Sequence, residues 1–218
     1  MSNSHGCFDV VVIGAGPSGA VASALLNKKG YRVLVLEKTH FPRFSIGESL
    51  LPQSMAFLEQ AGMLSAVEEA AFQFKNGAAF TCGDLHDCFD FREKFSEGWG
   101  TTFQVQRDRF DKILADEAEK QGVEVRYGQT VTAFSSDSQN ATLNVESEEG
   151  DSYQVEAKFV LDASGFGRVL PRLLDLEQPV DNHNLELASL TQMALLPVRI
   201  LLEKLLHTKY PIQLLLWF

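Results

Sequence analysis

Three glycines near the start of the chain have the spacing of a phosphate-binding turn. Gly14, Gly16 and Gly19, with Pro17 and Ser18 between them, lie in the sequence GAGPSG directly after the apolar run FDVVVI. In a dinucleotide fingerprint the first glycine permits a tight turn, the second lets the backbone approach a pyrophosphate, and the third lets helix and strand pack closely. A helix that begins here offers free N–H groups to phosphate oxygens. We therefore predict that the glycines, Pro17 and Ser18 bind a dinucleotide cofactor.

The elements expected around this turn place it between two buried strands. The apolar run before it predicts a parallel strand. Residues 20–29 predict a helix that ends at Gly30, and residues 31–37 predict a second buried strand. Glu37 closes that strand, where an acceptor for ribose hydroxyls belongs, and Lys38 follows it. A glycine-rich turn without a ligand is the alternative, but the order strand, turn, helix, strand favours the nucleotide site. The spacing alone does not separate NAD from FAD.

The stretch FPRFSIGESLLP, residues 41–52, interleaves charged residues and a glycine with apolar ones. Gly47 permits a close backbone approach to a ligand. Ser49 is placed to cap a helix over about residues 50–60. Two interpretations of Glu48 stay open: a contact on the cofactor side, or a solvated carboxylate in the first turn of that helix.

Lys75 lies in a looser strand-like segment, residues 72–82. A desolvated ammonium beside a substrate pocket can donate a hydrogen bond or act as a nucleophile. Most lysines are surface residues, and a place at an exposed strand edge is the plainer interpretation.

An amphipathic helix is predicted over residues 107–121, with Arg107 at its start. A cation at a helix N-terminus is unfavourable by about 0.3–1 kcal/mol, which favours a functional reason for this arginine. Alternation then predicts antiparallel strands at residues 123–127, 131–135, 141–146 and 153–160. The last of them runs into VLDASGFG, where Asp162 and Gly165 form a turn at a strand end.

Together these motifs resemble the two-domain FAD-dependent oxidoreductases of the p-hydroxybenzoate hydroxylase type. Within them the chain most resembles the branch of flavin-dependent halogenases and geranylgeranyl reductase-like enzymes. The matching motifs keep the family's order from residue 8 to about 178: DVVVIGAGPSG, LEK, FPRFSIGESLLP, QRDRFDKILADEA and VLDASGFG. The resemblance implies FAD as cofactor and an α/β fold, a Rossmann-like FAD-binding βαβ domain with an inserted antiparallel β-meander at about residues 123–161.

The resemblance also implies roles for individual residues. Beyond the glycine turn, the residues implied to bind FAD are Glu37, Lys38, Gly47, Glu48, Ser49, Arg107, Asp162 and Gly165. Among them, Glu37 resembles the acid on the adenosine ribose, and Arg107 resembles an FAD-contacting arginine whose guanidinium suits phosphate or ribityl oxygens. The segment around Gly47 lies along the flavin in this family, and the turn after Asp162 approaches the pyrophosphate. Lys75 matches the lysine that holds or captures hypohalous acid in the halogenases.

The implied function is oxidation, monooxygenation or halogenation of a small organic substrate by reduced flavin and O2. NAD(P)H or a flavin reductase is the expected electron source. Two alternatives stay open: a geranylgeranyl reductase-like enzyme that delivers hydride to a double bond, and an inactive FAD-binding fragment.

Composition narrows the remaining possibilities. The formal net charge of −10 argues against nucleic acid as a partner. We expect no membrane span, because no run of about 20 apolar residues occurs. The cysteines form no CxxC pair and the histidines have no metal-ligand spacing, which predicts a reducing compartment and no metal site. The N-terminus lacks the pattern of a signal peptide. We therefore expect a cytoplasmic protein.

The character of the sequence changes after about Val180. We predict an FAD-binding domain over residues 1–180 and an atypical leucine-rich tail over residues 181–218. The tail is either out of frame or a lineage-specific replacement, because the resemblance stops near Asp181. Relatives of this type continue into a substrate-covering sheet, so we expect the substrate domain to be largely missing.

Overall fold

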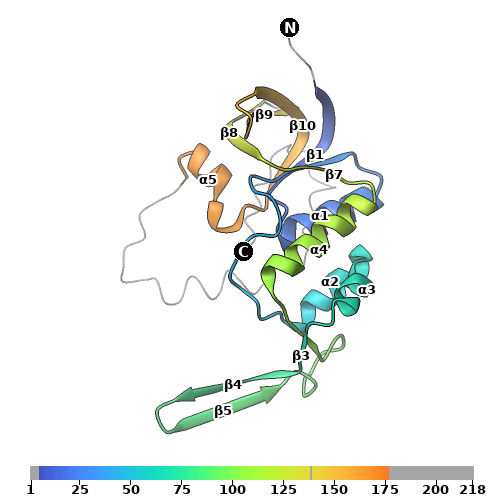
Figure 1. The fold of residues 1–218 in the computed structure, drawn as a ribbon, viewed down its shortest axis with the longest axis vertical. Helices are drawn as coiled ribbons and strands as arrows, with labels where there is room; N and C mark the ends of the chain where they lie inside the picture. The colour runs from blue at the N-terminus through green and yellow to red at the C-terminus, as the bar shows by residue number, and fades with distance from the viewer. Residues whose placement is uncertain (1–4, 138, 177–218) are drawn as a thin grey trace.

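Both strands and helices occur in the part of the chain that the computed structural model describes, residues 5–137 and 139–176. In chain order these elements are β1 (His5–Ile13), α1 (Pro17–Lys28), β2 (Val33–Leu36), α2 (Pro52–Ala61), α3 (Leu64–Glu69), β3 (Gln73–Lys75), β4 (Gly77–Cys82), β5 (Leu85–Asp90), β6 (Thr102–Gln104), α4 (Arg107–Lys120), β7 (Glu124–Arg126), β8 (Gln129–Ser136), β9 (Ala141–Ser147), β10 (Ser152–Asp162), the 3₁₀ helix η1 (Gly165–Gly167) and α5 (Val169–Leu173). A six-stranded sheet in the order β7-β2-β1-β10-β9-β8 forms the body of the molecule (Figure 1). Side chains of α1, α2, α3 and α4 pack on one face of this sheet, and α5 packs on the other. The predicted α/β fold is confirmed.

The parallel part of the sheet contains the predicted βαβ unit. β1 and β2 run parallel, with Val11 opposite Leu34, and α1 connects them. Both of these residues are completely buried, which explains why the two strands read as continuous apolar runs instead of alternating. α1 begins at Pro17, three residues before the predicted start at Ala20. Proline occupies the first helical turn because its fixed φ suits that position and its missing N–H is not needed there.

The predicted antiparallel direction of residues 123–127 is wrong. β7 runs parallel to β2, with Val125 opposite Val35. Helix α4 packs against α1 and leads directly into β7, so the strand that follows it enters the sheet in the same direction as β2. Three residues carry too little alternation to reveal a strand's direction, and the helical crossover decides it.

The other predicted antiparallel strands form a three-stranded meander. β9 pairs with β8 on one side and with β10 on the other, both antiparallel. In β9 the buried Ala141, Leu143 and Val145 alternate with more exposed residues, as the sequence predicts. β10 is longer than the meander needs, and its last residues pair in parallel with β1. It therefore carries Asp162 to a position opposite Ile13, where the glycine turn begins.

A two-stranded hairpin formed by β4 and β5 projects from the body of the molecule (Figure 1). The predicted strand over residues 72–82 is divided into β3 and β4, and β5 was not expected from the sequence. Phe80, Leu85 and Phe89 on this hairpin are each more than half exposed. Across the described ranges, none of the helices is long and apolar enough to cross a membrane. The predicted tail, residues 181–218, lies outside the described residues.

Candidate cofactor-binding site

The three glycines of the turn have two different structural roles. A Cβ atom at Gly19 would lie 1.9 Å from the carbonyl oxygen of Gly14, and a Cβ atom at Gly14 would lie 2.8 Å from the carbonyl oxygen of Ala163. Gly14 also has φ +99°, which side chains rarely adopt. A Cβ atom at Gly16, in contrast, would meet only the Arg43 side chain, at 3.5 Å. Two glycines therefore let turn, helix and β10 approach one another, whereas Gly16 has room for a Cβ atom at ordinary van der Waals distance from Arg43.

The N-terminus of α1 faces this turn with its first N–H groups free of helical partners. Gly16 is the N-cap residue, with φ −64° and ψ −178°, and Pro17 follows at the first helical position. The first turn contains no acidic residue and no side-chain cap. Ser18 and Gly19 thus offer backbone donors at the positive end of a 12-residue helix. This is the arrangement that phosphate oxygens prefer.

Glu37 lies beside the turn, buried to 4% exposure. Its Oε2 accepts a hydrogen bond of 2.8 Å from the backbone N–H of Ala15. Its Oε1 accepts two more from the Thr39 backbone N–H and hydroxyl, at 3.0 and 2.7 Å. Glu37 thus ties the end of β2 to the glycine turn, next to Gly16. Lys38 is exposed.

Asp162 organises the turn on the opposite side of Gly14. Its carboxylate is 2% exposed and accepts hydrogen bonds from the backbone N–H groups of Ser164 at 2.9 Å and Leu170 at 2.8 Å. Gly165, with φ +57°, begins the short helix η1 within the turn. Both carboxylate oxygens are engaged by backbone, so the carboxylate shapes the turn whose backbone abuts Gly14.

In the stretch FPRFSIGESLLP, residues 41–51 lie outside the helices and strands and are largely exposed. The side chains of Phe44, Ile46 and Leu51 are 60% or more exposed. Gly47 has φ +91°, so its predicted conformational freedom is used. The backbone carbonyl of Glu48 accepts a hydrogen bond of 2.8 Å from Val105, which fixes the segment beside β6.

The predicted cap of α2 by Ser49 is wrong. The helix begins at Pro52, Leu51 is its N-cap residue, and no side chain caps it. Ser49 instead forms an isolated bridge with Gln104 of β6. Proline again sets the helix start, which moves Ser49 and Glu48 out of the first turn. The interpretation of Glu48 as a first-turn carboxylate is therefore wrong as well.

Lys75 is held against this segment. Its ammonium donates a hydrogen bond of 2.5 Å to the Ser49 hydroxyl and one of 3.0 Å to the Leu50 carbonyl. The ammonium also lies 5.1 Å from the centre of the Phe91 ring. Burial lowers the pKa of Lys75 from its ordinary value. The side chain is half-buried at the end of β3, in a two-stranded sheet, which agrees both with a strand-edge lysine and with a place beside a pocket.

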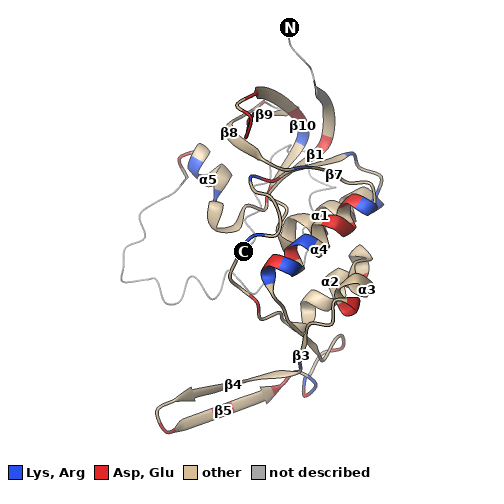
Figure 2. Cartoon of the chain, in the orientation of Figure 1, with Lys and Arg blue, Asp and Glu red and all other residues tan. Residues whose placement is uncertain are grey.

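Arg107 bridges α4 and the same segment. Its Nε and Nη2 donate to the two carboxylate oxygens of Asp111 at 2.7 and 3.0 Å, and its Nη1 donates to the carbonyls of Ile46 and Gly47. Acidic and basic residues alternate along α4 (Figure 2). The carboxylate of Asp111 offsets the cost of a cation at the start of the helix.

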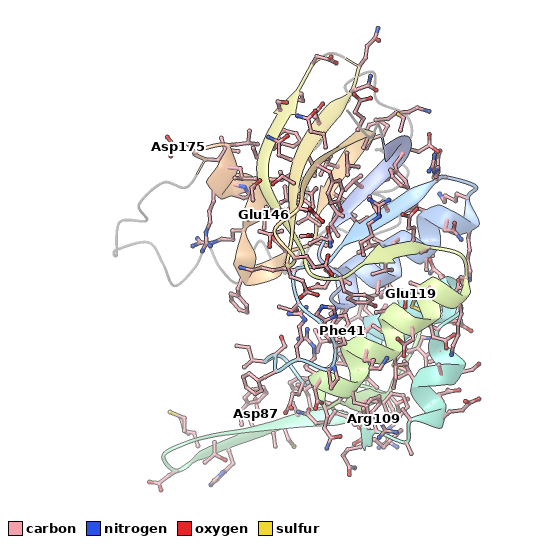
Figure 3. All side chains as sticks on the ribbon, turned by 45° about the horizontal axis from the view of Figure 1, so that its top comes forward. Phe41, Asp87, Arg109, Glu119, Glu146 and Asp175 are labelled. Atoms are coloured by element: carbon pink, nitrogen blue, oxygen red, sulfur yellow. The ribbon has the colours of Figure 1, made fainter. Side chains whose placement is uncertain are left out.

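Arg43 and Asp111 were not selected by sequence reasoning. Phe41 lies beside α4 near the centre of the molecule (Figure 3), and the Arg43 guanidinium lies 5.2 Å from its ring. Nη2 of Arg43 is 3.8 Å from Glu37 and 3.8 Å from Asp111. Its buried Nε has no hydrogen-bond partner among the described residues. The one available signal was Asp111 itself, a charged residue on the otherwise apolar face of the predicted helix.

The comparisons with known proteins agree with this geometry. A tryptophan 2-halogenase from Chondromyces crocatus is 36% identical over 158 residues, which cover 72% of this chain and 30% of that protein. A 12-dehydrotetracycline 5-monooxygenase/anhydrotetracycline 6-monooxygenase from Streptomyces rimosus is 29% identical over 175 residues, which cover 79% and 33%. The crystal structure of a flavoprotein/dehydrogenase from Cytophaga hutchinsonii matches with a TM-score of 0.76 and 49% identity, over 79% of this chain and 43% of that chain.

The chain belongs to the FAD binding domain family, whose sequence pattern matches residues 7–202. That match continues past Asp181, the predicted end of the resemblance. The chain spans less than half the length of the three relatives named above. The cofactor of the family, FAD, fits the residues present: Gly16 has room for a Cβ atom, the N-terminus of α1 has no side-chain cap, and Arg43 has a buried donor to spare. The predicted family and cofactor are confirmed.

Proposed function

We propose that the chain is the FAD-binding part of a halogenase or monooxygenase that acts on a small organic substrate. The observation that carries this proposal is the glycine turn at the uncapped N-terminus of α1, with buried Glu37 bonded to Ala15 of the turn and Arg43 beside Gly16. The halogenase and the monooxygenase among the relatives support this type of reaction. Bound flavin supplies redox chemistry with O2, and the protein binds and orients it and excludes water.

Within this proposal, each predicted residue has a place around the cofactor. The glycine turn with Pro17 and Ser18 receives the pyrophosphate, and Glu37 accepts from the ribose, with Lys38 at the solvent side. The turn of Asp162 and Gly165 closes the opposite wall. The residues proposed to lie along the flavin are Gly47, Glu48, Ser49 and Arg107. The proposal is supported by their convergence on one segment and one end of α4.

Lys75 is proposed as the catalytic residue that holds the halogenating or oxidising species for the substrate. Two of its donors are used by Ser49 and Leu50, and an ammonium has three, so one remains for a ligand. Its lowered pKa increases the neutral, nucleophilic fraction at a given pH.

The electron source is proposed to be NAD(P)H or a flavin reductase, since the relatives include flavin-dependent halogenases. We also propose that residues 1–180 act as the FAD-binding unit and that residues 181–218 are a separate tail. A cytoplasmic location is supported by the free, exposed thiols of Cys7, Cys82 and Cys88. A fluorescent fusion of the chain tests the location directly.

The central experiment is to purify the 218-residue chain and record its flavin absorbance before and after adding FAD. Bound flavin is expected, and a colourless protein that does not retain added FAD overturns the proposal for this chain. Reduced flavin, O2, halide and a panel of small aromatic compounds then test turnover. Product that requires O2 supports a halogenase or monooxygenase, whereas anaerobic reduction of an alkene supports the geranylgeranyl reductase-like alternative. Bound flavin without turnover supports the inactive fragment.

A further inference from the structure

Asp111 is a carboxylate with no exposed surface, on the face of α4 that packs into the core. Its neighbours on that face include Phe110 and Leu114, both buried. A charge in such a place is costly unless several partners compensate it. Its partners are two arginines, and they come from different parts of the chain.

The first partner, Arg107, forms a two-pronged contact with Asp111, at 2.7 and 3.0 Å. This leaves the remaining terminal nitrogen of the guanidinium directed at the carbonyls of Ile46 and Gly47, to which it donates. Because a guanidinium is planar and rigid, fixing one edge of it also fixes the direction of the other. Asp111 therefore acts through Arg107 on the backbone of the segment around Ile46 and Gly47.

The second partner, Arg43, is shared between two buried acids. Its Nη2 lies 3.8 Å from an oxygen of Asp111 and 3.8 Å from an oxygen of Glu37. Glu37 in turn accepts the N–H of Ala15 in the glycine turn. Charges of opposite sign thus alternate from the glycine turn to α4, in the order Glu37, Arg43, Asp111, Arg107.

We propose that Asp111 is a positioning residue of the FAD site, which sets the direction of both arginines and thereby preforms the segment around Ile46 and Gly47. This inference rests on the proposed FAD site, and it assigns Asp111 no direct contact with the cofactor. Without the carboxylate, Arg107 loses its two-pronged anchor and the segment samples other conformations. The apparent affinity for FAD then falls in proportion to the fraction of molecules that keep the binding-competent conformation.

The test compares Asp111→Asn with a matched control, Asp116→Asn, in the 218-residue chain. Asp116 lies on the same helix and also pairs with a cation four residues away, Lys112, but at the exposed surface. We expect Asp111→Asn to raise the Kd for FAD at least about tenfold and Asp116→Asn to leave it unchanged. An unchanged or lower Kd in Asp111→Asn overturns the proposal, because removal of an acid that only neutralises the arginines favours the anionic cofactor.

A second readout does not involve the cofactor. Trypsin cleavage after Arg43 is expected to be severalfold faster in Asp111→Asn than in Asp116→Asn, because Arg43 is released and Phe44 is already 89% exposed. A lower melting temperature with unchanged cleavage and unchanged Kd means a purely structural role and overturns the proposal. If the unmodified chain does not bind FAD, the proposed function fails for this chain, and the cleavage rates alone decide the role of Asp111.

Arg107→Lys carries the test if Asp111→Asn does not fold. Lysine keeps the charge but lacks the planar fork, so positioning predicts the same loss of FAD affinity. A normal Kd for Arg107→Lys contradicts the proposal. Where both variants fold, the double variant is expected to bind FAD no more weakly than the weaker-binding single variant, because both changes break the same contact.

Discussion

Substitution of alanine at Gly16 and at Gly19 separates cofactor binding from folding. At Gly16 the new Cβ atom would lie 3.5 Å from the Arg43 side chain, an ordinary van der Waals distance, and the backbone angles of φ −64° and ψ −178° suit any residue. Alanine is a poorer N-cap than glycine by about 0.5–1 kcal/mol. The reduced freedom of the unfolded chain returns about 0.4–1 kcal/mol. Gly16→Ala should therefore change the free energy of unfolding by less than about 1 kcal/mol.

The same methyl group would occupy space beside the turn where we propose that the pyrophosphate binds. Overpacking of a close contact typically costs about 1–3 kcal/mol. At about 1.4 kcal/mol for each tenfold change, Gly16→Ala should raise the Kd for FAD by about 5- to 150-fold.

At Gly19 the expected result is the reverse. The new Cβ atom would lie 1.9 Å from the carbonyl oxygen of Gly14, so helix and turn must separate. We expect Gly19→Ala to destabilise the protein by about 3 kcal/mol or more even without cofactor.

Denaturant unfolding of the cofactor-free variants and titration with FAD measure the two effects independently. If Gly16→Ala folds normally and binds FAD as tightly as the unchanged chain, the proposal that the pyrophosphate of FAD lies against Gly16 is wrong. If Gly19→Ala is as stable as the unchanged chain, the close packing of α1 against the turn is wrong.

Three further predictions follow from single contacts. An amine reagent should label Lys75 with a midpoint pH below the ordinary lysine pKa of about 10.4, since burial lowers the pKa of Lys75. Labelling at the ordinary midpoint would contradict that burial. Asp9→Asn should lower stability by at most about 1 kcal/mol at neutral pH, because it removes a surface pair with Lys158. Lys158 and the N–H of Arg32 hold the Asp9 pKa below its usual value. The stability that Asp9 contributes is therefore present above the unfolded-state pKa of about 3.9 and is lost as the pH falls through the lower folded-state pKa. A difference in stability between Asp9→Asn and the unchanged chain that persists in stronger acid refutes this prediction. Leu143→Ala, at a completely buried position of β9, should cost about 2–5 kcal/mol in denaturant unfolding, and a cost below 1 kcal/mol would mean that the meander is not packed as described.

Much of the fold could be predicted from local patterns in the sequence. β1 and β2 are continuous apolar runs because both faces of each strand are covered, and β9 alternates because its outer face is not. Gly14 and Gly19 of the turn were predictable because the close approach of backbone leaves no room for a side chain at these positions. Helix starts were less accurate at α1 and α2, where proline rather than the first apolar residue sets the boundary.

The candidate site was predictable where a residue's own backbone or chain position carries the signal. Glu37 closes a buried strand next to the turn, and Gly47 has the left-handed conformation that its type suggested. Ser49 was misassigned, because a serine before a helix has several local hydrogen-bonding options and its real partner, Lys75, is 26 residues away.

The sequence by itself determined the class of the protein, because phosphate-binding glycines, strand periodicity and the family's motifs are encoded in neighbouring residues. Only the tertiary structure decided the direction of β7 and the connection of Arg43, Asp111 and Arg107. The direction of β7 depends on which way α4 returns the chain, and the charge cluster depends on residues far apart in sequence meeting in a buried place. Buried charges are stable only with specific partners in space, and no local pattern names those partners.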